Sequence, residues 1–491
     1  DSNNRITQIE ASTGEKVSYE YDVFGNLIAF TDVLGNKSTF KYDSRHYLTE
    51  IYNADGKMLS KNEYDADGRL VKTTDSAGNA ITYSHDIEGR EEVITDRNGG
   101  VTRYIYDEKG NILSQTDPMN NTVKNTYDSN GNLSSKTDAM GNVTNYSYDS
   151  SGNMLELTDA EGNTVTNKYN SKGFVTSINA MGVDIMSVKY DDKGNTSATI
   201  DALGNEINYS YDGKGNLKSV TDEIGTYMNM TYDSKGNVIT ATNGVGTTAE
   251  FTYDDKGNCT SKTLSYISEG AATKVTERYT YDAAGNLIET IYSDGTIKTT
   301  EYNNIGKVAS ETDSAGRKTS YKYDVFGNLS QINYPDGTME SFTYDKEGHN
   351  LTATDRLGRK VSMTYDAVGN LLTKTYPNGA VVSYSYDANY NLVSTTSTSG
   401  AVTTYEYDKI GRNTAIIDAL GNRTSFAYNK NSQLASMTDA KGNVHNYTYD
   451  LNGNRIKTTY PDGSSVSSEY DARGRVTSQT DQHGYKTSYT Y

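Results

Sequence analysis

YDSSGNMLELTDAEGNTVTNK, from Tyr148 to Lys168, is one copy of a unit that recurs along the whole chain. Its outline is Y-D-x-x-G-N-L-x-x-x-T-D-x-x-G-N-x-T-x-Y-x, and the Tyr-Asp pair returns every 21 residues in nearly all copies. A fixed period of this length is typical of repeat proteins, in which each unit packs against its neighbours and none buries a core alone. The repeat therefore decides the fold.

The tyrosine of each Tyr-Asp pair is the anchor of its unit, and we expect the anchors to form a structural ladder along the array. The anchors are Tyr21, Tyr42, Tyr64, Tyr106, Tyr127, Tyr148, Tyr190, Tyr211, Tyr232, Tyr253, Tyr281, Tyr323, Tyr344, Tyr365, Tyr386, Tyr407, Tyr449 and Tyr470. The gaps in this series are filled in register by His85-Asp86, Tyr169-Asn170, Tyr302-Asn303 and Tyr428-Asn429, and Tyr491 ends it. Of the 22 intervals, 20 span 21 residues, Tyr42 to Tyr64 spans 22, and Tyr253 to Tyr281 spans 28.

Each unit contains two D-x-x-G turns, as at Asp149 and Asp159. Asp at the first position can return its carboxylate to backbone N–H groups, and Gly at the fourth can adopt positive φ. Both residues therefore favour a type I turn that closes a hairpin. The four prolines all fall in such turns, at Pro118, Pro335, Pro377 and Pro461.

The segments between turns are short and rich in Thr, Val, Tyr and Ser, which predicts strands and not helices. We expect two antiparallel strands per unit. Alternation places Thr144, Tyr146 and Tyr148 on one face of the sheet. Aromatic and β-branched pairs between neighbouring strands would each contribute about 0.2–1 kcal/mol. The fold class is therefore all-β, a repetitive array of antiparallel β-hairpins.

The length of the array sets its overall form. At ~4.8 Å per strand, the ribbon would be ~210 Å long, and one closed circuit of it would be ~67 Å across. Sheets of this width coil or close, and side chains cannot fill such a circuit. We expect a spiral sheet, a hollow β-shell or part of one. Residues 1–491 would form a single continuous array, with an irregular long hairpin at about residues 260–278 and no separate toxin, plug or anchor domain.

Composition limits the partners. The chain has 46 Lys+Arg against 64 Asp+Glu, a formal charge of −18, which disfavours nucleic acid and anionic membranes. No apolar run is long enough for a membrane span, so we expect no membrane insertion. No leader is visible at the first residues. A single cysteine, Cys259, excludes an internal disulfide and a Cys-rich zinc site.

The residues show no catalytic, cofactor or metal constellation, so we expect no enzyme, no cofactor and no metal. Cys259 stands where Leu and Ile recur, which indicates a buried thiol. The five histidines are dispersed over unrelated units. EYDADG, from Glu63, resembles the start of a calcium loop, but Thr74 stands where that loop needs Glu. TNGVGT, from Thr242, lies in a hairpin turn with no helix after it, unlike a phosphate loop.

Two features suggest contacts with other molecules. The extra residues between Tyr253 and Tyr281 lengthen one hairpin, and its tip, with Leu264, Tyr266, Ile267 and Glu269, is a possible partner loop. Tyrosine rings can also stack on sugars, which leaves glycan binding open. Unpaired strands at the two ends leave self-association open as well.

YDxxGNL at a 21-residue period resembles the YD repeat, or RHS repeat, of bacterial Rhs polymorphic toxins, toxin-complex cages, wall-associated proteins and animal teneurins. The resemblance runs from about Tyr21 to Tyr491. It implies a β-sheet shell that often encloses a C-terminal toxin domain, or a surface adhesion role. The family's Asp-Pro self-cleavage motif has no counterpart here, because the one Asp-Pro, at Asp117 and Pro118, lies inside an ordinary turn.

The expected function is a structural shell segment of a large secreted or cell-surface bacterial protein, with its export signal outside this sequence. The shell would enclose or display a domain of the same polypeptide or a partner protein. The alternatives are a surface adhesin that binds carbohydrate and a self-associating surface fibre.

Overall fold

The computed structural model describes residues 1–491, and every regular element in it is a β-strand. The 46 strands form one sheet, in which each strand pairs antiparallel with the strands before and after it in the chain. The all-β hairpin array and the spiral sheet expected from the repeat are confirmed.

The strands are β1 (Gln8–Glu10), β2 (Lys16–Tyr21), β3 (Leu27–Thr31), β4 (Lys37–Tyr42), β5 (Leu48–Tyr52), β6 (Met58–Tyr64), β7 (Leu70–Asp75), β8 (Ala80–Asp86), β9 (Glu91–Thr95), β10 (Val101–Tyr106), β11 (Ile112–Thr116), β12 (Thr122–Tyr127), β13 (Leu133–Thr137), β14 (Val143–Tyr148), β15 (Met154–Thr158), β16 (Thr164–Tyr169), β17 (Val175–Ala180), β18 (Val183–Tyr190), β19 (Thr196–Asp201), β20 (Glu206–Tyr211), β21 (Leu217–Asp222), β22 (Gly225–Tyr232), β23 (Val238–Asn243), β24 (Thr248–Tyr253), β25 (Cys259–Ser268), β26 (Ala271–Tyr281), β27 (Leu287–Ile291), β28 (Ile297–Tyr302), β29 (Val308–Thr312), β30 (Lys318–Tyr323), β31 (Leu329–Asn333), β32 (Met339–Tyr344), β33 (Asn350–Thr354), β34 (Lys360–Tyr365), β35 (Leu371–Thr375), β36 (Val381–Tyr386), β37 (Leu392–Thr396), β38 (Val402–Tyr407), β39 (Asn413–Ile417), β40 (Arg423–Tyr428), β41 (Leu434–Thr438), β42 (Val444–Tyr449), β43 (Arg455–Thr459), β44 (Ser465–Tyr470), β45 (Val476–Thr480) and β46 (Lys486–Ser488).

The turn after Tyr148 shows why the unit folds locally as a hairpin. Asp149 Oδ1 accepts hydrogen bonds from the backbone N–H groups of Ser151 (2.8 Å) and Asn153 (2.9 Å), and Oδ2 accepts one from the Asn153 side chain (2.8 Å). Gly152 takes φ 84° at the fourth position. The second turn, at Asp159, repeats the same three bonds. The carboxylate thus satisfies N–H groups that the strands leave unpaired.

A β-bulge follows each Tyr anchor from Tyr21 to Tyr470, but not His85. Between β20 and β21, Ser210 pairs with Ser219, but Tyr211 pairs with Leu217, so one extra residue lies on β21. The same shift recurs at the other Tyr anchors of the array. A bulge bends the strand and increases its local twist, so the bulges of nearly all units together curl the whole ribbon.

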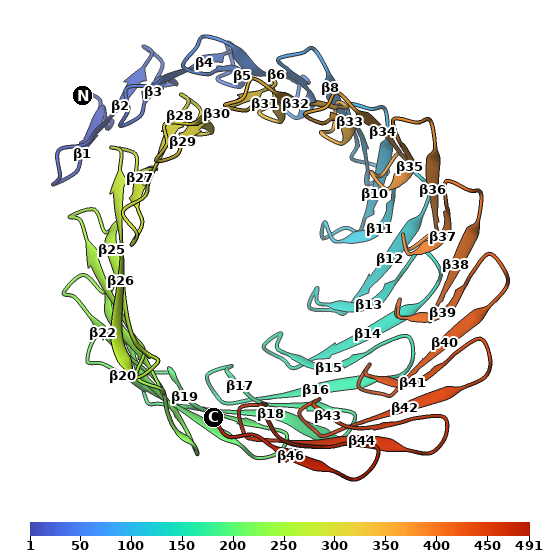
Figure 1. The fold of residues 1–491 in the computed structure, drawn as a ribbon. Coiled ribbons are helices and arrows are strands. Elements are labelled where there is room, and N and C mark those ends of the chain that lie inside the picture. Colours follow the sequence, from blue (N-terminus) through green and yellow to red (C-terminus); the bar gives the residue numbers. More distant parts are fainter.

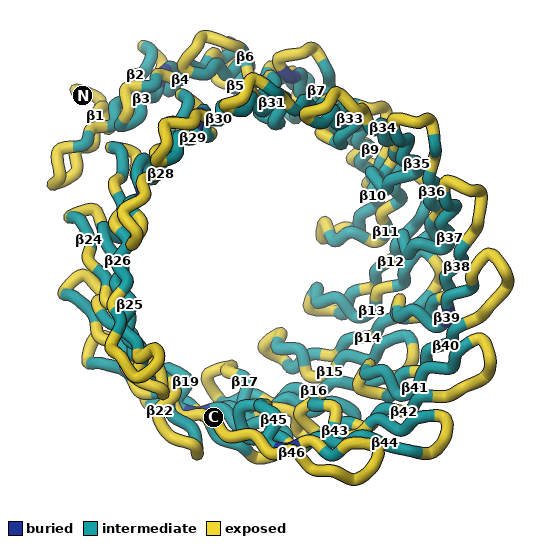
Figure 2. The backbone as a smooth tube through the Cα atoms, in the orientation of Figure 1, coloured by how far each residue is buried: buried dark blue, intermediate teal, exposed yellow.

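The ribbon winds around a hollow centre (Figure 1). The second passage of the chain, β24 to β46, runs along the first, β1 to β22, around the same circle. Only 7 of 491 residues are buried, and the exposed residues gather at the turns (Figure 2). The protein is therefore a wall one sheet thick, without a conventional core.

Both long edges of this ribbon are rows of turns, because the hydrogen bonds between strands run along the spiral. We call the turns that follow the anchors YD turns, and the second turns of the units TD turns. In Figure 1, the YD turns between β10 and β11 and between β12 and β13 point toward the centre, whereas the TD turns between β37 and β38 and between β39 and β40 point outward.

Candidate functional site: the ladder, the seam and the long hairpin

The anchor tyrosines form a ladder through their hydroxyl groups. Tyr232 donates its phenolic hydrogen to the backbone carbonyl of Leu217 at 2.7 Å, and Tyr211 donates to the carbonyl of Thr196 at 2.9 Å. In each case the acceptor is the residue that pairs with the preceding anchor, next to the extra residue of the bulge. Each phenol therefore joins one hairpin to the next.

Strand pairing explains why these carbonyls need a partner. The register between β21 and β22 ends at the pair Ser219 and Asn229, two residues short of Leu217. A partly buried backbone carbonyl that strand pairing leaves without a hydrogen bond needs another donor. The phenol of Tyr232, which is half-buried, supplies that donor.

The same bond recurs along the chain at 2.7–3.1 Å. It is made by Tyr21, Tyr64, Tyr127, Tyr169, Tyr190, Tyr211, Tyr232, Tyr253, Tyr281, Tyr302, Tyr323, Tyr344, Tyr365, Tyr386, Tyr407, Tyr428, Tyr449, Tyr470 and Tyr491. Among the other anchors, Tyr106 donates to the Glu92 carboxylate at 3.0 Å, and Tyr42 and Tyr148 make no hydroxyl bond.

Anchor rings do not stack on one another; the aromatic pairs between units that involve an anchor ring join it to a residue of the preceding unit. Where the fifth residue after an anchor is aromatic or basic, it covers the next anchor ring. Phe174 lies 5.1 Å from the ring of Tyr190, and the guanidinium of Arg412 lies 4.9 Å from that of Tyr428. Sequence reasoning missed this contact because most units have Asn there, which bonds its own turn.

A seam joins the first passage of the ribbon to the second. At the seam, TD turns of the first passage meet YD turns of the second, and every hydrogen bond across it involves at least one side chain. The Asn389 amide donates to Asp138 at 2.6 Å, although that carboxylate also accepts from its own Asn142 at 2.9 Å. The anchors of these two turns, Tyr386 and Tyr127, are twelve units apart.

The twelve-unit offset holds along the whole seam. It relates Lys256 to Glu15, Asn304 to Asp55, Asn98 to Asp345, Arg97 to Glu347, Lys409 to Glu161, Asn452 to Asp201 and Arg473 to Asp222. At two strands per unit and ~4.8 Å per strand, twelve units give a circuit of ~115 Å and a width of ~37 Å. The ribbon therefore makes about two narrow circuits and not the single ~67 Å circuit that its length alone would allow.

Charged pairs reinforce the seam at both ends. The Arg473 guanidinium donates to Asp222, with one N–O distance of 2.8 Å, and both side chains are largely buried. The Lys256 ammonium bonds to Glu15 and lowers the pKa of that carboxyl to about 2. Tyr390 occupies a glycine position at φ 66° and reaches one unit further, where its hydroxyl meets Asp117 and Asn121.

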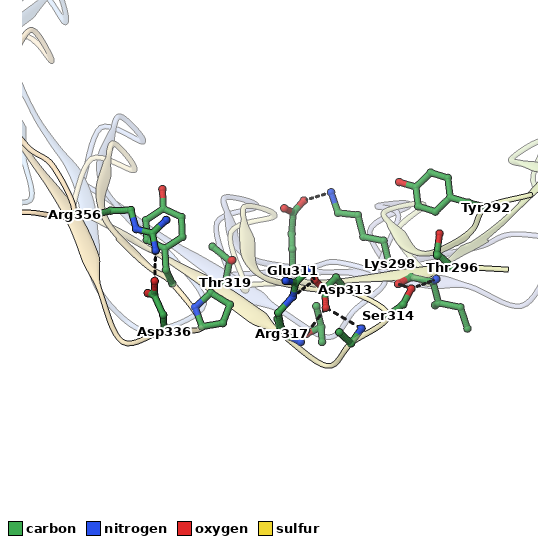
Figure 3. A pocket seen from close by; sticks show the side chains of 15 residues that line it. Tyr292, Thr296, Lys298, Glu311, Asp313, Ser314, Arg317, Thr319, Asp336 and Arg356 are labelled. Atoms are coloured by element: carbon green, nitrogen blue, oxygen red, sulfur yellow. Dashed lines mark hydrogen bonds and ion pairs between the residues drawn. The ribbon is translucent and has the colours of Figure 1, made fainter. Parts of the chain in front are cut away.

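The TD turns of the second passage border two similar hollows. The first has a volume of about 700 Å³ and lies between Tyr292 and Tyr334. Figure 3 shows Lys298 and Glu311 pointing toward each other across it, at 2.6 Å, with Tyr292 and Arg356 at opposite ends. The second hollow, of about 710 Å³, lies two units further on, at Phe342, Val361 and Tyr376. Their cations are largely paired: Arg317 with Asp313, Arg356 with Asp336 and Arg359 with Asp355.

The long hairpin expected near residues 260–278 consists of β25 and β26, the two longest strands of the sheet. They pair without a break from Ser261 and Arg278 to Ser268 and Ala271. The two turn residues between them, Glu269 and Gly270, both have positive φ, as a tight hairpin turn requires. Ile267 is 78% exposed and Glu269 is exposed, whereas Leu264 and Tyr266 are half-buried. The expected partner loop thus presents Ile267 and Glu269 to solvent.

The remaining candidates stay apart from one another. Cys259 is half-buried, its thiol donates to the Ser261 carbonyl at 3.3 Å, and burial raises its pKa. His85 takes an anchor position, and His349 bonds the Asp345 of its own turn. Asp65, in the calcium-like EYDADG stretch, accepts the N–H of Arg69 as any turn Asp does.

No three His, Cys, Asp or Glu side chains converge as they would around a metal ion. The structure contains no helix that could span a membrane.

Comparison with known proteins gives two family matches. The Teneurin YD-shell family matches residues 106–288. The RHS Repeat family matches residues 21–58, 64–99, 89–119, 302–339, 344–381, 365–402, 386–424, 407–444 and 428–465, which together cover more than half of the chain. No curated protein matches the sequence.

Solved structures share the fold at low identity. The crystal structure of TcdB2-TccC3-TEV has a TM-score of 0.62 at 14% identity, over 95% of this chain and 30% of that one. The Tc holotoxin pore of Photorhabdus luminescens, with a mutation in TccC3, has a TM-score of 0.59 at 14% identity, over 95% of this chain and 30% of that one. The crystal structure of TcdB2-TccC3 has a TM-score of 0.57 at 14% identity, over 97% and 35%. The chain thus spans about a third of the length of these chains.

Proposed function

The chain belongs to the RHS-repeat family, also called the YD-repeat family, and from this membership we propose that it is a non-enzymatic wall segment of a larger secreted or cell-surface bacterial protein. The wall encloses or displays another domain, either of the same polypeptide or of a partner. The observation that carries the proposal is the seam, which closes two circuits of a one-layer sheet around a hollow centre. A wall with side-chain contacts between circuits is suited to containing a cargo.

Protection of a cargo tests this function directly. The probe is the full-length gene product, which carries this segment together with whatever domains flank it, treated with protease before and after the seam is weakened by Arg473→Gln. We expect a flanking domain that resists cleavage in the parent and becomes sensitive in the variant. Lys124→Gln, on an exposed strand position, is the matched control. Equal cleavage of that domain in the parent and in the unfolded protein would contradict enclosure.

Glycan binding is a second candidate function, favoured by the two hollows at Tyr334 and Tyr376. Rings beside carboxylates and guanidinium groups offer stacking and hydroxyl bonding together, and the paired cations suit a neutral sugar better than an anionic one. Tyr334→Asp and Tyr376→Asp introduce the residue that most TD turns already have, so both variants should fold. Binding on a neutral-glycan array should fall in both variants, and Tyr460→Asp, at the same turn position outside these hollows, should leave it unchanged.

A further inference from the structure

The long hairpin leaves one strand edge of the sheet without a partner. On one side, β26 pairs with β25 from Ala271 to Arg278. On the other side, its pairing with β27 begins only at Arg278 and Ile291. The seven residues from Ala271 to Glu277 therefore have a free edge. In ordinary units such as β20, only the first two residues, Glu206 and Ile207, lack a partner on the corresponding side.

The direction of the free backbone groups follows from the pairing. A two-residue turn makes Ser268 and Ala271 a hydrogen-bonded pair, after which bonded and non-bonded pairs alternate. Ala271, Thr273, Val275 and Glu277 thus bond inward to β25. Ala272, Lys274 and Thr276 direct their N–H and C=O groups outward, away from β25. These three residues form a row of alternating donors and acceptors at strand spacing.

The surroundings leave this row open to an extended chain. Because Arg278 pairs with Ile291, the strand position beside Ala272 to Thr276 lies beyond the end of β27, above the turn that begins at Tyr292. Tyr292 and Ile297, at that turn, are 38% and 41% exposed. Lys274 is exposed and has one distant carboxylate, Glu250, at 3.9 Å. The edge therefore combines free backbone groups of β26, the exposed apolar side chains of Tyr292 and Ile297 at the neighbouring turn, and the ammonium group of Lys274.

We propose that the free edge of β26 is a docking site for one extended strand of a partner polypeptide, which adds to the sheet antiparallel to β26 as a continuation of β27. Main-chain bonds to Ala272, Lys274 and Thr276 hold the strand. An acidic side chain opposite Lys274 and an apolar side chain above Tyr292 select it. This inference assigns the partner contact to the backbone of β26 and does not depend on the shell function.

Lysine on an edge strand is also a common device against unwanted strand pairing. The two roles differ in their outcome, because a protective lysine would keep strands away whether or not they carry an acidic residue. A docking lysine favours a strand with Glu at its centre over the same strand with Lys. The test therefore compares both peptides on the same protein.

The probe is the acetylated and amidated peptide Thr-Val-Thr-Glu-Val-Thr-Val, added to the 491-residue chain and followed by amide hydrogen exchange. We expect exchange at Ala272, Lys274 and Thr276 to slow at least tenfold. The Lys-centred peptide should give no protection, and neither should a copy N-methylated at alternate residues, which removes the donors that face β26. Protection confined to the end strands β1 and β46, or no protection at millimolar peptide, would overturn the proposal.

Proline at position 274 isolates the free edge. Lys274→Pro removes an outward N–H and leaves the inward bonds to β25, so the hairpin should keep its circular dichroism and its exchange protection at Thr273 and Val275. Binding of the peptide should be lost. Lys274→Gln keeps the N–H and should retain binding with a weaker dependence on salt. Peptide binding that survives Lys274→Pro would contradict the proposal, because that variant has no usable edge.

Discussion

Nε2 of His85 lies 2.9 Å from the carbonyl oxygen of Leu70, in the place where the tyrosine of other units donates its hydroxyl to the preceding bulge. The imidazole replaces the phenol without changing the acceptor. The recurring element of the ladder is thus a donor that reaches the bulge carbonyl, and tyrosine is its usual form. This finding makes the hydroxyl, more than the ring, the part of the anchor whose loss can be tested.

Removing one anchor hydroxyl should loosen one joint between hairpins. Tyr232→Phe leaves the Leu217 carbonyl without its donor, at a cost of about 1 kcal/mol. Hydrogen exchange should become faster in β21 and β22 and stay unchanged ten units away, since repeats couple mainly to their neighbours. Tyr485→Phe, at an exposed ring without a hydroxyl bond, is the control. A uniform change along the chain would contradict a local joint.

Alkaline pH should open the ladder. Burial raises the pKa of Tyr211 and of Tyr232, whereas an unfolded tyrosine titrates near ~10. Because the folded pKa lies above the unfolded one, the stability that these phenols contribute is present below pH ~10 and lost as the pH rises through their folded values. Ionisation of Tyr211 and Tyr232, followed by the absorbance of tyrosinate, should coincide with loss of the β-sheet circular dichroism signal above pH ~10.

Acid should act on the turns. The Asn153 side chain is the main cause that lowers the pKa of Asp149, and Asn216 does the same for Asp212. A folded pKa below the unfolded value of ~3.9 means that this stability is present above pH ~4 and lost as the pH falls through the folded values. Thermal unfolding should thus show a nearly constant midpoint at neutral pH and a steep fall below pH ~4. A midpoint that stays constant to pH 2 would contradict the role of the turn carboxylates.

The seam should open independently of the hairpins. Arg473→Gln removes the charge that meets Asp222, and because both side chains are largely buried, about 1–3 kcal/mol of local stability should be lost. We expect faster exchange at the turn after β21 and at the turn between β44 and β45, with intact strand protection on both sides.

Tyr390→Gly should show two opposed effects. It relieves the left-handed backbone at φ 66° but loses the hydroxyl contact with Asp117. The Tyr390 turn should become more rigid while the Asp117 turn exchanges faster.

Shortening the long hairpin should leave the array folded. Leu264 pairs with Val275, so replacing Leu264–Val275 with Asp-Ala-Ala-Gly-Asn cuts the hairpin squarely and restores the 21-residue spacing. The thermal midpoint should stay within a few degrees of the parent. Outside the hairpin, the removed segment pairs only with β24, through Thr248 with Ser265 and Ala249 with Leu264. A large loss of stability would show that the extension supports the wall.

The period predicted most of the local structure. Asp149 and Gly152 fix their turn through the side chain and backbone of a few residues, and these preferences are readable from the unit itself. The anchor role of Tyr232 was readable only in part. Its acceptor exists because a bulge shortens the pairing of β21 with β22, and a bulge depends on the three-dimensional strand register.

The seam could not be read from the sequence. The contact between Asn389 and Asp138 depends on the curvature per unit, which decides that unit n meets unit n plus twelve. A slightly flatter ribbon would bring different side chains together. All turns share nearly the same sequence pattern, so the sequence does not show which of them meet. Asn389 is not distinguishable in the sequence from the third residue of any other turn.

The rows of turns along both edges have a consequence for how such a protein can change in length. A closed barrel must fix its strand number, because one more hairpin alters its diameter and every register. A coiled strip has no such constraint: duplication or loss of one 21-residue unit slides the overlap between circuits by one place and leaves the radius as it was. The enclosed volume can thus grow by tandem duplication of the repeat. Each inserted unit brings the turn side chains that bond to the neighbouring circuit.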